Sequence, residues 1–337
     1  MQINRICRLD ETAEPLVRVD APMPSPGDKQ LLVRVSVCGV CHTELDEIEG
    51  RTPPPVLPVI PGHQVVGTVE ETGDGCRRFA KGDRVGIGWI YHSDGGEQEN
   101  LSPDFRATGR DVDGGYAEYF VVPEDYACAI PDAFSDVEAA PLLCAGAIGY
   151  RSLRLCELDD GETLGLMGFG GSAHIVLQLA KHLYPNSPVV VFARSSEQQA
   201  FARQLGAGWA GGVDDTPPSA PQAIIDTTPA WRPVLAAMEH LAAGGRLVIN
   251  AIRKTDADKS RMAEVDYPRH LWMEKEIKSV ANLCFSDIAE FLPLAAEIPI
   301  RVETEVFALE DANIALQSLH RESVRGAKVL AVNRVTD

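Results

Sequence analysis

The sequence predicts an α/β protein with two domains, one rich in antiparallel β-strands and one built on a doubly wound parallel sheet. The chain has 337 residues, which exceeds the size of most single hydrophobic cores and favours two domains. Up to about residue 140, short β-like segments alternate with Gly and Pro, as in antiparallel barrel-like domains. From about residue 136, strand-like and helix-like segments alternate at the spacing of βαβ units, which indicates a parallel sheet.

The individual elements follow from this pattern. In the first part we expect strands at 30–37, 65–69, 83–87 and 116–122, and a polar loop over 91–113. A stretch rich in Ala, Leu and Gly predicts one helix over 136–155. In the second part the expected strands are 163–167, 189–192, 223–226 and 246–249, and the expected helices are 172–183, 197–205 and 231–243. After about residue 281 we expect helices at 288–296 and 310–321 and a last strand at 328–332.

Charge and composition exclude several classes of partner. The formal net charge is -18, so nucleic acid and anionic membrane surfaces, which are themselves negative, are not expected partners. No apolar run reaches the roughly 18 residues that span a bilayer. The N-terminal segment lacks the apolar core of a signal peptide, so we expect a cytoplasmic location. In that setting the eight cysteines are expected to be thiols or metal ligands rather than disulfides.

A glycine-rich turn of the form G-x-G-x-x-A follows the strand at 163–167 and opens the helix at 172–183. In dinucleotide-binding folds the first glycine permits the tight turn and the second lets the backbone approach the pyrophosphate, while the final small residue keeps the helix close to the strand. Because strand, turn and helix occur in this order, we expect a dinucleotide site, the alternative being a plain strand–helix turn. The candidate cofactor-binding residues are Gly168, Gly170, Gly171, Ser172 and Ala173.

The end of the next strand bears on the type of dinucleotide. An acidic residue about 20 positions beyond the glycines would bind the ribose 2′-hydroxyl of NAD. The chain instead has Ala193, followed by Arg194 and Ser195, which could bind a 2′-phosphate through a charge pair and a hydroxyl donor. We therefore expect NADP(H) in preference to NAD(H). The alternative is that Arg194 is only a solvated loop residue.

Cysteine and histidine residues of the first part indicate a possible metal site. The Cys-x-x-Cys sequence at 38–41 is compatible with a redox pair, with half of a zinc ribbon, or with one metal ligand whose partners are distant. The third interpretation gains from His63, in a Pro-Gly turn, and from Cys144, near the domain boundary. With Cys41 they form a set of two thiolates and one imidazole that suits Zn²⁺ and leaves a coordination position open. Taken singly, such residues are more often buried cysteines or hydrogen-bonded histidines.

At these residues the chain resembles the zinc-containing alcohol dehydrogenases of the medium-chain dehydrogenase/reductase superfamily. The matching stretches, in the family's order, are CGVCHTEL, PVIPGHQVVGTVEETG, KGDRVGIGW, VDGGYAEYFVVPEDY, AAPLLCAGAIGY, GFGGSAHIVLQLAK and ARQLGA. The resemblance implies a GroES-like catalytic domain over 1–144 and 282–337, with a Rossmann domain inserted over 145–281.

The motif positions also imply residue roles. The implied zinc ligands are Cys41, His63 and Cys144. The hydroxyl of Thr43 would contact the substrate oxygen and begin the proton relay. Glu44 would support the ligand histidine from behind, and Trp89 would form a wall of the substrate pocket, although it is equally compatible with ordinary core packing.

Several positions depart from the family pattern. The lobe that often holds a second, structural zinc has no cysteine here, with Asp94 and Ser102 in the corresponding places, so we expect one zinc per chain. Gln64 replaces a glutamate next to the ligand histidine, which keeps an oxygen near the metal but removes a negative charge. Asp46 replaces a relay histidine, which changes the route of the proton. Ile148 replaces a threonine that usually contacts the nicotinamide.

The resemblance implies reversible oxidation of a primary or secondary alcohol to an aldehyde or ketone, with hydride passing to the nicotinamide. The expected partners are a small alcohol or aldehyde and further copies of the chain, as a dimer or tetramer. Two other functions are compatible with the same residues. One is a zinc-free quinone or enoyl reductase of the same superfamily, and the other is a non-catalytic nucleotide-binding protein, because fold does not fix function.

Overall fold

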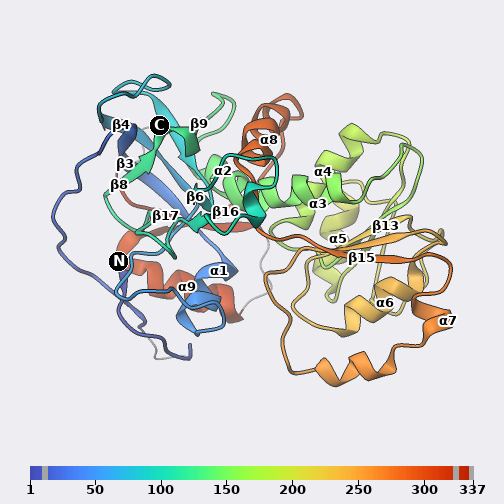
Figure 1. Cartoon of the computed structure of the whole chain (residues 1–337). Helices are drawn as coiled ribbons and strands as arrows, with labels where there is room; N and C mark the ends of the chain where they lie inside the picture. Colours follow the sequence, from blue (N-terminus) through green and yellow to red (C-terminus); the bar gives the residue numbers. More distant parts are fainter. Residues whose placement is uncertain (10–13, 322–325, 334–337) are drawn as a thin grey trace. The chain divides into compact units, whose positions relative to one another are not determined.

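The structure is a computed structural model that describes residues 1–9, 14–321 and 326–333. The chain forms two compact units (Figure 1). The first consists of Met1–Ala147 together with Asn282–Asp337, and the second of Ile148–Ala281. The chain therefore leaves the first unit once and returns to it.

A mixed sheet organises the first unit. Strand β3 is central, because β4 pairs along one of its edges while β8 and β17 share the other, all antiparallel. β16 extends the sheet beyond β17 in parallel, and β5 and β9 extend it beyond β4. Over the described residues these seven strands are β3 (Gln30–Val40), β4 (Val65–Thr72), β5 (Arg84–Ile87), β8 (Tyr119–Pro123), β9 (Ala127–Ala129), β16 (Thr304–Ala308) and β17 (Ala327–Ala331).

The apolar pattern of β3 explains its central place. Leu31 and Leu32, on opposite faces, are both almost fully buried, as are Val33, Val35 and Val37. Each such side chain contributes about 1.5–3 kcal/mol by leaving water. Because β3 is covered on both faces, it lies in the core of the unit. It therefore fixes the position of Cys41, which directly follows its last residue.

The predicted single helix over 136–155 is wrong in one respect, because the structure divides it into three consecutive segments. These are α2 (Asp136–Pro141), a π-helical turn (Leu142–Gly146) and α3 (Ala147–Leu155). Pro141 supplies no backbone N–H to an α-helical ladder, which accounts for the change of hydrogen-bonding pattern after it. π-turns of this kind are frequent at functional sites, and this one contains Cys144.

The second unit holds a parallel sheet in the order β12-β11-β10-β13-β14-β15, six strands within the described residues. Counted from β10, this is the order 3-2-1-4-5-6 of dinucleotide-binding folds. The predicted α/β class with a doubly wound sheet is confirmed. The strands are β10 (Leu164–Met167), β11 (Val189–Phe192), β12 (Trp209–Gly211), β13 (Ala223–Asp226), β14 (Arg246–Ile249) and β15 (Glu276–Ser279). The helices include α4 (Ala173–Leu183), α5 (Ser196–Gln204), α6 (Arg232–His240) and α7 (Tyr267–His270).

Some elements carry no sequence pattern that predicts them. All four residues of β15 are exposed, so no apolar alternation marks the strand. Helix α1 (His42–Ile48) is short and acidic, although Glu44–Ile48 are buried. The predicted loop over 91–113 contains the short paired strands β6 (Ile90–His92) and β7 (Arg106–Ala107).

Helices α8 (Phe285–Glu297) and α9 (Ala312–Arg321) lie close to their predicted places.

No helix in the described part of the chain has both the length and the apolar character required to cross a bilayer.

A buried carboxylate joins the loop after β6 to the start of α8. Glu99 is 5% exposed, and its Oε1 accepts a hydrogen bond from the backbone N–H of Phe285 at 2.7 Å. The hydroxyl of Tyr126 donates to the other carboxylate oxygen at 3.2 Å. Ser93 completes the junction by donating from its hydroxyl to the Glu99 carbonyl at 2.7 Å. A negative charge at a helix N-terminus is also favoured by the helix dipole.

We expect Glu99→Gln to lower the free energy of unfolding by about 1–3 kcal/mol, because it removes a charged acceptor from a buried N–H. Urea denaturation measures this difference. The matched control is Glu97→Gln, since Glu97 is exposed on the same loop and its replacement should change the stability by less than about 0.5 kcal/mol. Equal stability of both variants and the unaltered protein would contradict this role of Glu99.

Candidate metal centre and dinucleotide-binding turn

Three potential metal ligands from distant segments meet in the first unit. The ligand atoms of Cys41, His63 and Cys144 all lie within 4.8 Å of one another. His63 is 1% exposed, and its Nε2 lies 3.3 Å from the Sγ of Cys144. The three candidate ligands predicted from the sequence, of which the first and last are more than one hundred positions apart, therefore lie together in the structure.

Local structure holds each ligand in place. β3 ends at Val40 and α1 begins at His42, so Cys41 is the N-cap of the helix. His63 follows Gly62, whose φ of 100° is a conformation that favours glycine. A Cβ on Gly62 would also lie 2.3 Å from the ring of Tyr116. Cys144 lies in the middle of the π-turn, where the extra residue of the wider turn sets the direction of its side chain.

Glu44 orients the ligand histidine. Its Oε1 lies 2.7 Å from His63 Nδ1, while its Oε2 accepts a hydrogen bond from the backbone N–H of Cys41 at 2.8 Å. Glu44 is fully buried. A carboxylate on the Nδ1 side fixes the ring so that Nε2 faces the two sulfur atoms, which is the arrangement common at zinc-bound histidines. The Trp89 ring packs edge-on against His63, with 4.8 Å between centroids.

The three residues strongly influence one another's pKa values. A hydrogen bond with Cys144 holds the pKa of Cys41 well below its ordinary value, although burial acts against this, and His63 adds to the lowering. The same hydrogen bond, together with burial, raises the pKa of Cys144 well above its ordinary value. Burial lowers the pKa of His63, but the Glu44 carboxylate and the contact with Cys41 outweigh it and hold this pKa well above the ordinary value.

The residues present fit a zinc ion. At ordinary Zn–S and Zn–N bond lengths, tetrahedral ligand atoms are separated by roughly 3.5 Å, and His63 Nε2 and Cys144 Sγ are 3.3 Å apart. Two sulfurs and one imidazole nitrogen are the soft and borderline donors that zinc prefers. Three protein ligands leave the fourth position open, which is the pattern of a catalytic site.

Other predicted site residues surround this cluster. The hydroxyl of Thr43 lies 3.5 Å from Cys41 Sγ, and Trp89 is 7% exposed. Gln64 is 4% exposed, and its side chain packs over Gly39, where an added Cβ would lie 2.3 Å from Oε1. Gly39 therefore has to be glycine for the Gln64 side chain to keep this position.

Helix α1 carries two further carboxylates near these residues in the sequence, Asp46 and Glu47. Arg51 donates to Asp46 Oδ1 from Nε at 2.7 Å and lies 2.6 Å away through Nη2. Glu47, which the sequence analysis missed, is 1% exposed, and its Oε1 has no hydrogen-bond partner among the described residues. Burial, reinforced by the charge of Glu44, raises the pKa of Glu47 well above its ordinary value. Its place four residues after Thr43, on the same helical face, was the available sequence signal.

The glycine-rich turn opens α4 in the second unit. Gly168 has a φ of 86°, and its N–H donates to the carbonyl of Phe192 at 2.8 Å. A Cβ on Gly170 would meet nothing within 4 Å, so its backbone borders open space. Gly171 and Ser172 are half-buried, whereas Ala173 is 1% exposed at the start of the helix. This is the backbone geometry that lets a helix N-terminus receive a phosphate.

The segment between β11 and α5 holds the residues expected to select the type of dinucleotide. Ala193 is buried, and Arg194 is exposed. Ser195 is the N-cap of α5, where its hydroxyl accepts a hydrogen bond from the backbone N–H of Gln198 at 3.2 Å. Ile148, which the sequence analysis placed near the nicotinamide, is half-buried at the start of α3.

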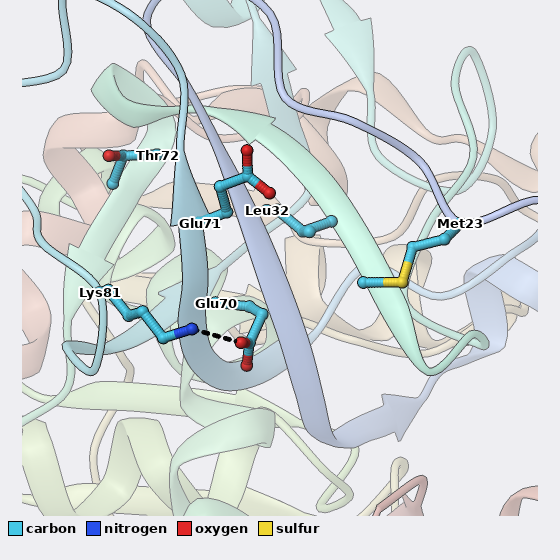
Figure 2. A pocket seen from close by; sticks show the side chains of 6 residues that line it. All are labelled: Met23, Leu32, Glu70, Glu71, Thr72 and Lys81. Carbon is cyan, nitrogen blue, oxygen red and sulfur yellow. Dashed lines mark hydrogen bonds and ion pairs between the residues drawn. The ribbon is translucent and has the colours of Figure 1, made fainter.

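A surface hollow of about 530 Å³ lies elsewhere on the first unit (Figure 2). The ion pair between Glu70 and Lys81, at 2.6 Å, forms part of its wall and holds the pKa of Glu70 below the ordinary value. Its remaining lining residues are Met23, Leu32, Glu71 and Thr72. No residue of the predicted metal or cofactor sites lines it.

A β-rich unit with a Cys2His cluster and a separate Rossmann unit define the class of medium-chain dehydrogenases and reductases. Residues 27–132 match the sequence model of the alcohol dehydrogenase GroES-like domain. The chain is 43% identical over 329 residues to the probable alcohol dehydrogenase AdhA of Mycobacterium tuberculosis (strain CDC 1551 / Oshkosh), covering 94% of this chain and 93% of that relative. The chain therefore belongs to the zinc-containing alcohol dehydrogenase family, and it is an oxidoreductase.

Solved structures share the fold. The cinnamyl alcohol dehydrogenase SbCAD4 from Sorghum bicolor is 26% identical, with a TM-score of 0.81 and 94% coverage of both chains. The alcohol dehydrogenase of Aeropyrum pernix is 24% identical, with a TM-score of 0.85, and the match covers 98% of this chain and 99% of that one. The GroES-like character that the sequence implied for the first unit is confirmed by the family match.

We expect Glu44→Gln to weaken zinc binding by about tenfold to hundredfold, because it removes the charge that orients His63. Competition with a chromophoric chelator measures the affinity. Glu71→Gln serves as the control, since Glu71 is exposed and lies outside the cluster. Unchanged affinity in Glu44→Gln would show that Glu44 does not support the metal.

Proposed function

We propose that this protein is a zinc-dependent alcohol dehydrogenase and aldehyde reductase that transfers hydride between a small primary or secondary alcohol and a nicotinamide cofactor. The observation that carries this proposal is the cluster of Cys41, His63 and Cys144, with the buried Glu44 next to the histidine. The two units would then serve as the catalytic domain and the cofactor domain. The relatives named alcohol dehydrogenases support the same activity.

Cys41, His63 and Cys144 would hold one zinc ion per chain. When bound, zinc supplies a Lewis acid that lowers the pKa of the alcohol, and the nicotinamide supplies the hydride acceptor. Thr43, which lies 3.5 Å from Cys41 Sγ, would take the proton of the alcohol, because a hydroxyl both accepts and donates hydrogen bonds. The apolar ring of Trp89 would border the substrate and exclude water.

The next step of the proton route involves α1. Arg51 holds Asp46 through two contacts, which supports a role for Asp46 in fixing the helix rather than in carrying the proton. Gln64 would lie beside the metal without adding a negative charge. A less negative surrounding would leave the zinc a stronger Lewis acid than a glutamate at this position would.

For the cofactor we propose NADP(H) in preference to NAD(H). Arg194 is exposed immediately after β11, and the position before it is Ala193 rather than an acid. The Ser195 hydroxyl accepts a hydrogen bond from the Gln198 backbone N–H and also interacts with the Glu197 carboxylate, so it would turn from Glu197 to donate to a phosphate. A guanidinium and a hydroxyl at this strand end suit a 2′-phosphate.

The two other functions considered from the sequence are less well supported. A zinc-free quinone or enoyl reductase has no use for three potential metal ligands within 4.8 Å of one another. A non-catalytic nucleotide-binding protein has no use for a hydroxyl such as that of Thr43 beside such a cluster.

We also propose a homo-oligomer that forms along β15. This strand is the terminal strand of the six-stranded sheet among the described residues, so its outer N–H and C=O groups are open to pairing. Apolar side chains gather nearby, with Trp272 55%, Met273 54% and Ile277 45% exposed. Light scattering tests this, and a monomer at micromolar concentration would contradict it.

Purified protein should contain about one zinc ion per chain, and Cys41→Ala should lose both the metal and alcohol oxidation. Elemental analysis and a spectrophotometric assay of nicotinamide reduction measure the two quantities. Cys7→Ala is the matched control, because Cys7 lies outside the cluster. Full activity in a zinc-free preparation would overturn the proposed function.

Arg194→Asp should reduce kcat/KM for NADP⁺ by about 10- to 100-fold, the equivalent of one charged hydrogen-bonding contact. It should leave kcat/KM for NAD⁺ unchanged or higher. Arg261→Asp is the control, since Arg261 is a partly exposed arginine elsewhere in the same unit. A marked preference for NAD⁺ in the unaltered protein would refute this assignment of Arg194.

A further inference from the structure

A buried ion pair lies at the carboxyl edge of the parallel sheet in the second unit. Asp226 is the last residue of β13 and is fully buried. Lys254, on the segment after β14, forms the pair with it, and its side chain is only 7% exposed. Nothing in the sequence marks Lys254, which lies in a polar stretch without an apolar pattern.

The pair fixes the backbone of the segment that follows β13. The Lys254 ammonium also donates to the carbonyl of Thr228 at 2.6 Å. Asp226 Oδ1 in turn accepts hydrogen bonds from the Thr228 backbone N–H at 2.9 Å and from its hydroxyl at 2.7 Å. Thr228 is therefore held on its N–H, its hydroxyl and its carbonyl by one pair of charges.

This segment packs directly against the glycine-rich turn. Thr227 donates to the carbonyl of Met167 from its backbone N–H at 3.0 Å and from its hydroxyl at 3.2 Å. A Cβ on Gly168 would lie 2.9 Å from Thr227 Oγ1 and 3.0 Å from Thr228 Cγ2. Any movement of Thr228 would therefore reach the backbone of the turn.

The strand order assigns this segment to one half of the dinucleotide. In a sheet of this order, a dinucleotide lies across the point where the order reverses, with one mononucleotide on each side. The reversal falls between β10 and β13. Arg194 follows β11 on one side, which the proposed function assigns to the adenosine half. Asp226 and Lys254 follow β13 and β14 on the other side, where the nicotinamide half would lie.

Stability alone is a weak reason for such a pair. Taking two charges out of water costs much of what their attraction returns, and apolar replacements of similar volume are often no less stable. The pair does, however, fix the position of the backbone at Thr228, because it binds the N–H, the hydroxyl and the carbonyl of that residue.

We propose that Lys254, through Asp226 and Thr228, is a positioning residue for the nicotinamide half of the cofactor. This inference rests on the proposed function, since it requires a bound dinucleotide. Lys254 should therefore strengthen binding of the whole dinucleotide and leave binding of the adenosine half alone unchanged.

The test compares whole cofactors with their adenosine fragments. Isothermal titration of the zinc-loaded protein gives Kd for NADP⁺ and for adenosine 2′,5′-bisphosphate, and for NAD⁺ and AMP. Lys254→Met alone leaves Asp226 buried and unpaired, which endangers folding. The double variant Asp226→Asn/Lys254→Met removes both charges and keeps similar volumes. Lys259→Met is the matched control, because Lys259 is 67% exposed on the same segment.

We expect the double variant to bind the preferred dinucleotide about tenfold more weakly and to bind the matching adenosine fragment as the unaltered protein does. Unchanged affinity for the dinucleotide would overturn the inference. An equal loss for dinucleotide and fragment would also overturn it, because that is the result of a purely structural role. If the unaltered protein binds neither NADP⁺ nor NAD⁺, the proposed function fails as well.

Discussion

The contact between Glu44 and His63 is the interaction on which the proposed metal centre depends. A buried imidazole is free to turn either nitrogen toward a cluster of thiols, and the carboxylate on Nδ1 removes that freedom. Because Glu44 also accepts from the N–H of Cys41, the same side chain fixes two of the three ligands relative to each other. The long buried strand β3 then ties this arrangement to the core, since Cys41 follows its last residue.

The two units illustrate two ways to keep polar groups inside a protein. In the first, the Glu99 carboxylate is buried next to donors at the N-terminus of α8 and on Tyr126. In the second, a full ion pair between Asp226 and Lys254 is buried at a strand end. Both arrangements restrain loops that have few apolar side chains of their own. A loop without cysteines after β6 is thus joined to the core by hydrogen bonds within the protein.

Most of the fold could be predicted from the sequence wherever burial leaves a periodic pattern. Strands β11, β13 and β14 have the predicted bounds, because all their residues are apolar except Asp226 at the end of β13 and Arg246 at the start of β14. The exposed β15 and the short acidic α1 could not be found this way, since neither presents an apolar repeat. For the site, Cys41, His63 and Cys144 were identifiable by motif. Lys254 was not, because its role arises from a tertiary contact with a residue 28 positions away.

The π-turn over Leu142–Gly146 has a consequence for how this enzyme tolerates change. A π-turn accommodates one more residue than the α-helical turn it replaces. Removing a single residue there would restore an α-helical turn between the same flanks and change the direction of side chains within the turn, because successive residues of an α-helix are rotated by about 100°. Such a deletion would turn Cys144 out of register with β3 and α1 while leaving every other ligand in place. Chain length between α2 and α3 is therefore as much a requirement of the proposed metal centre as the identity of its candidate ligands.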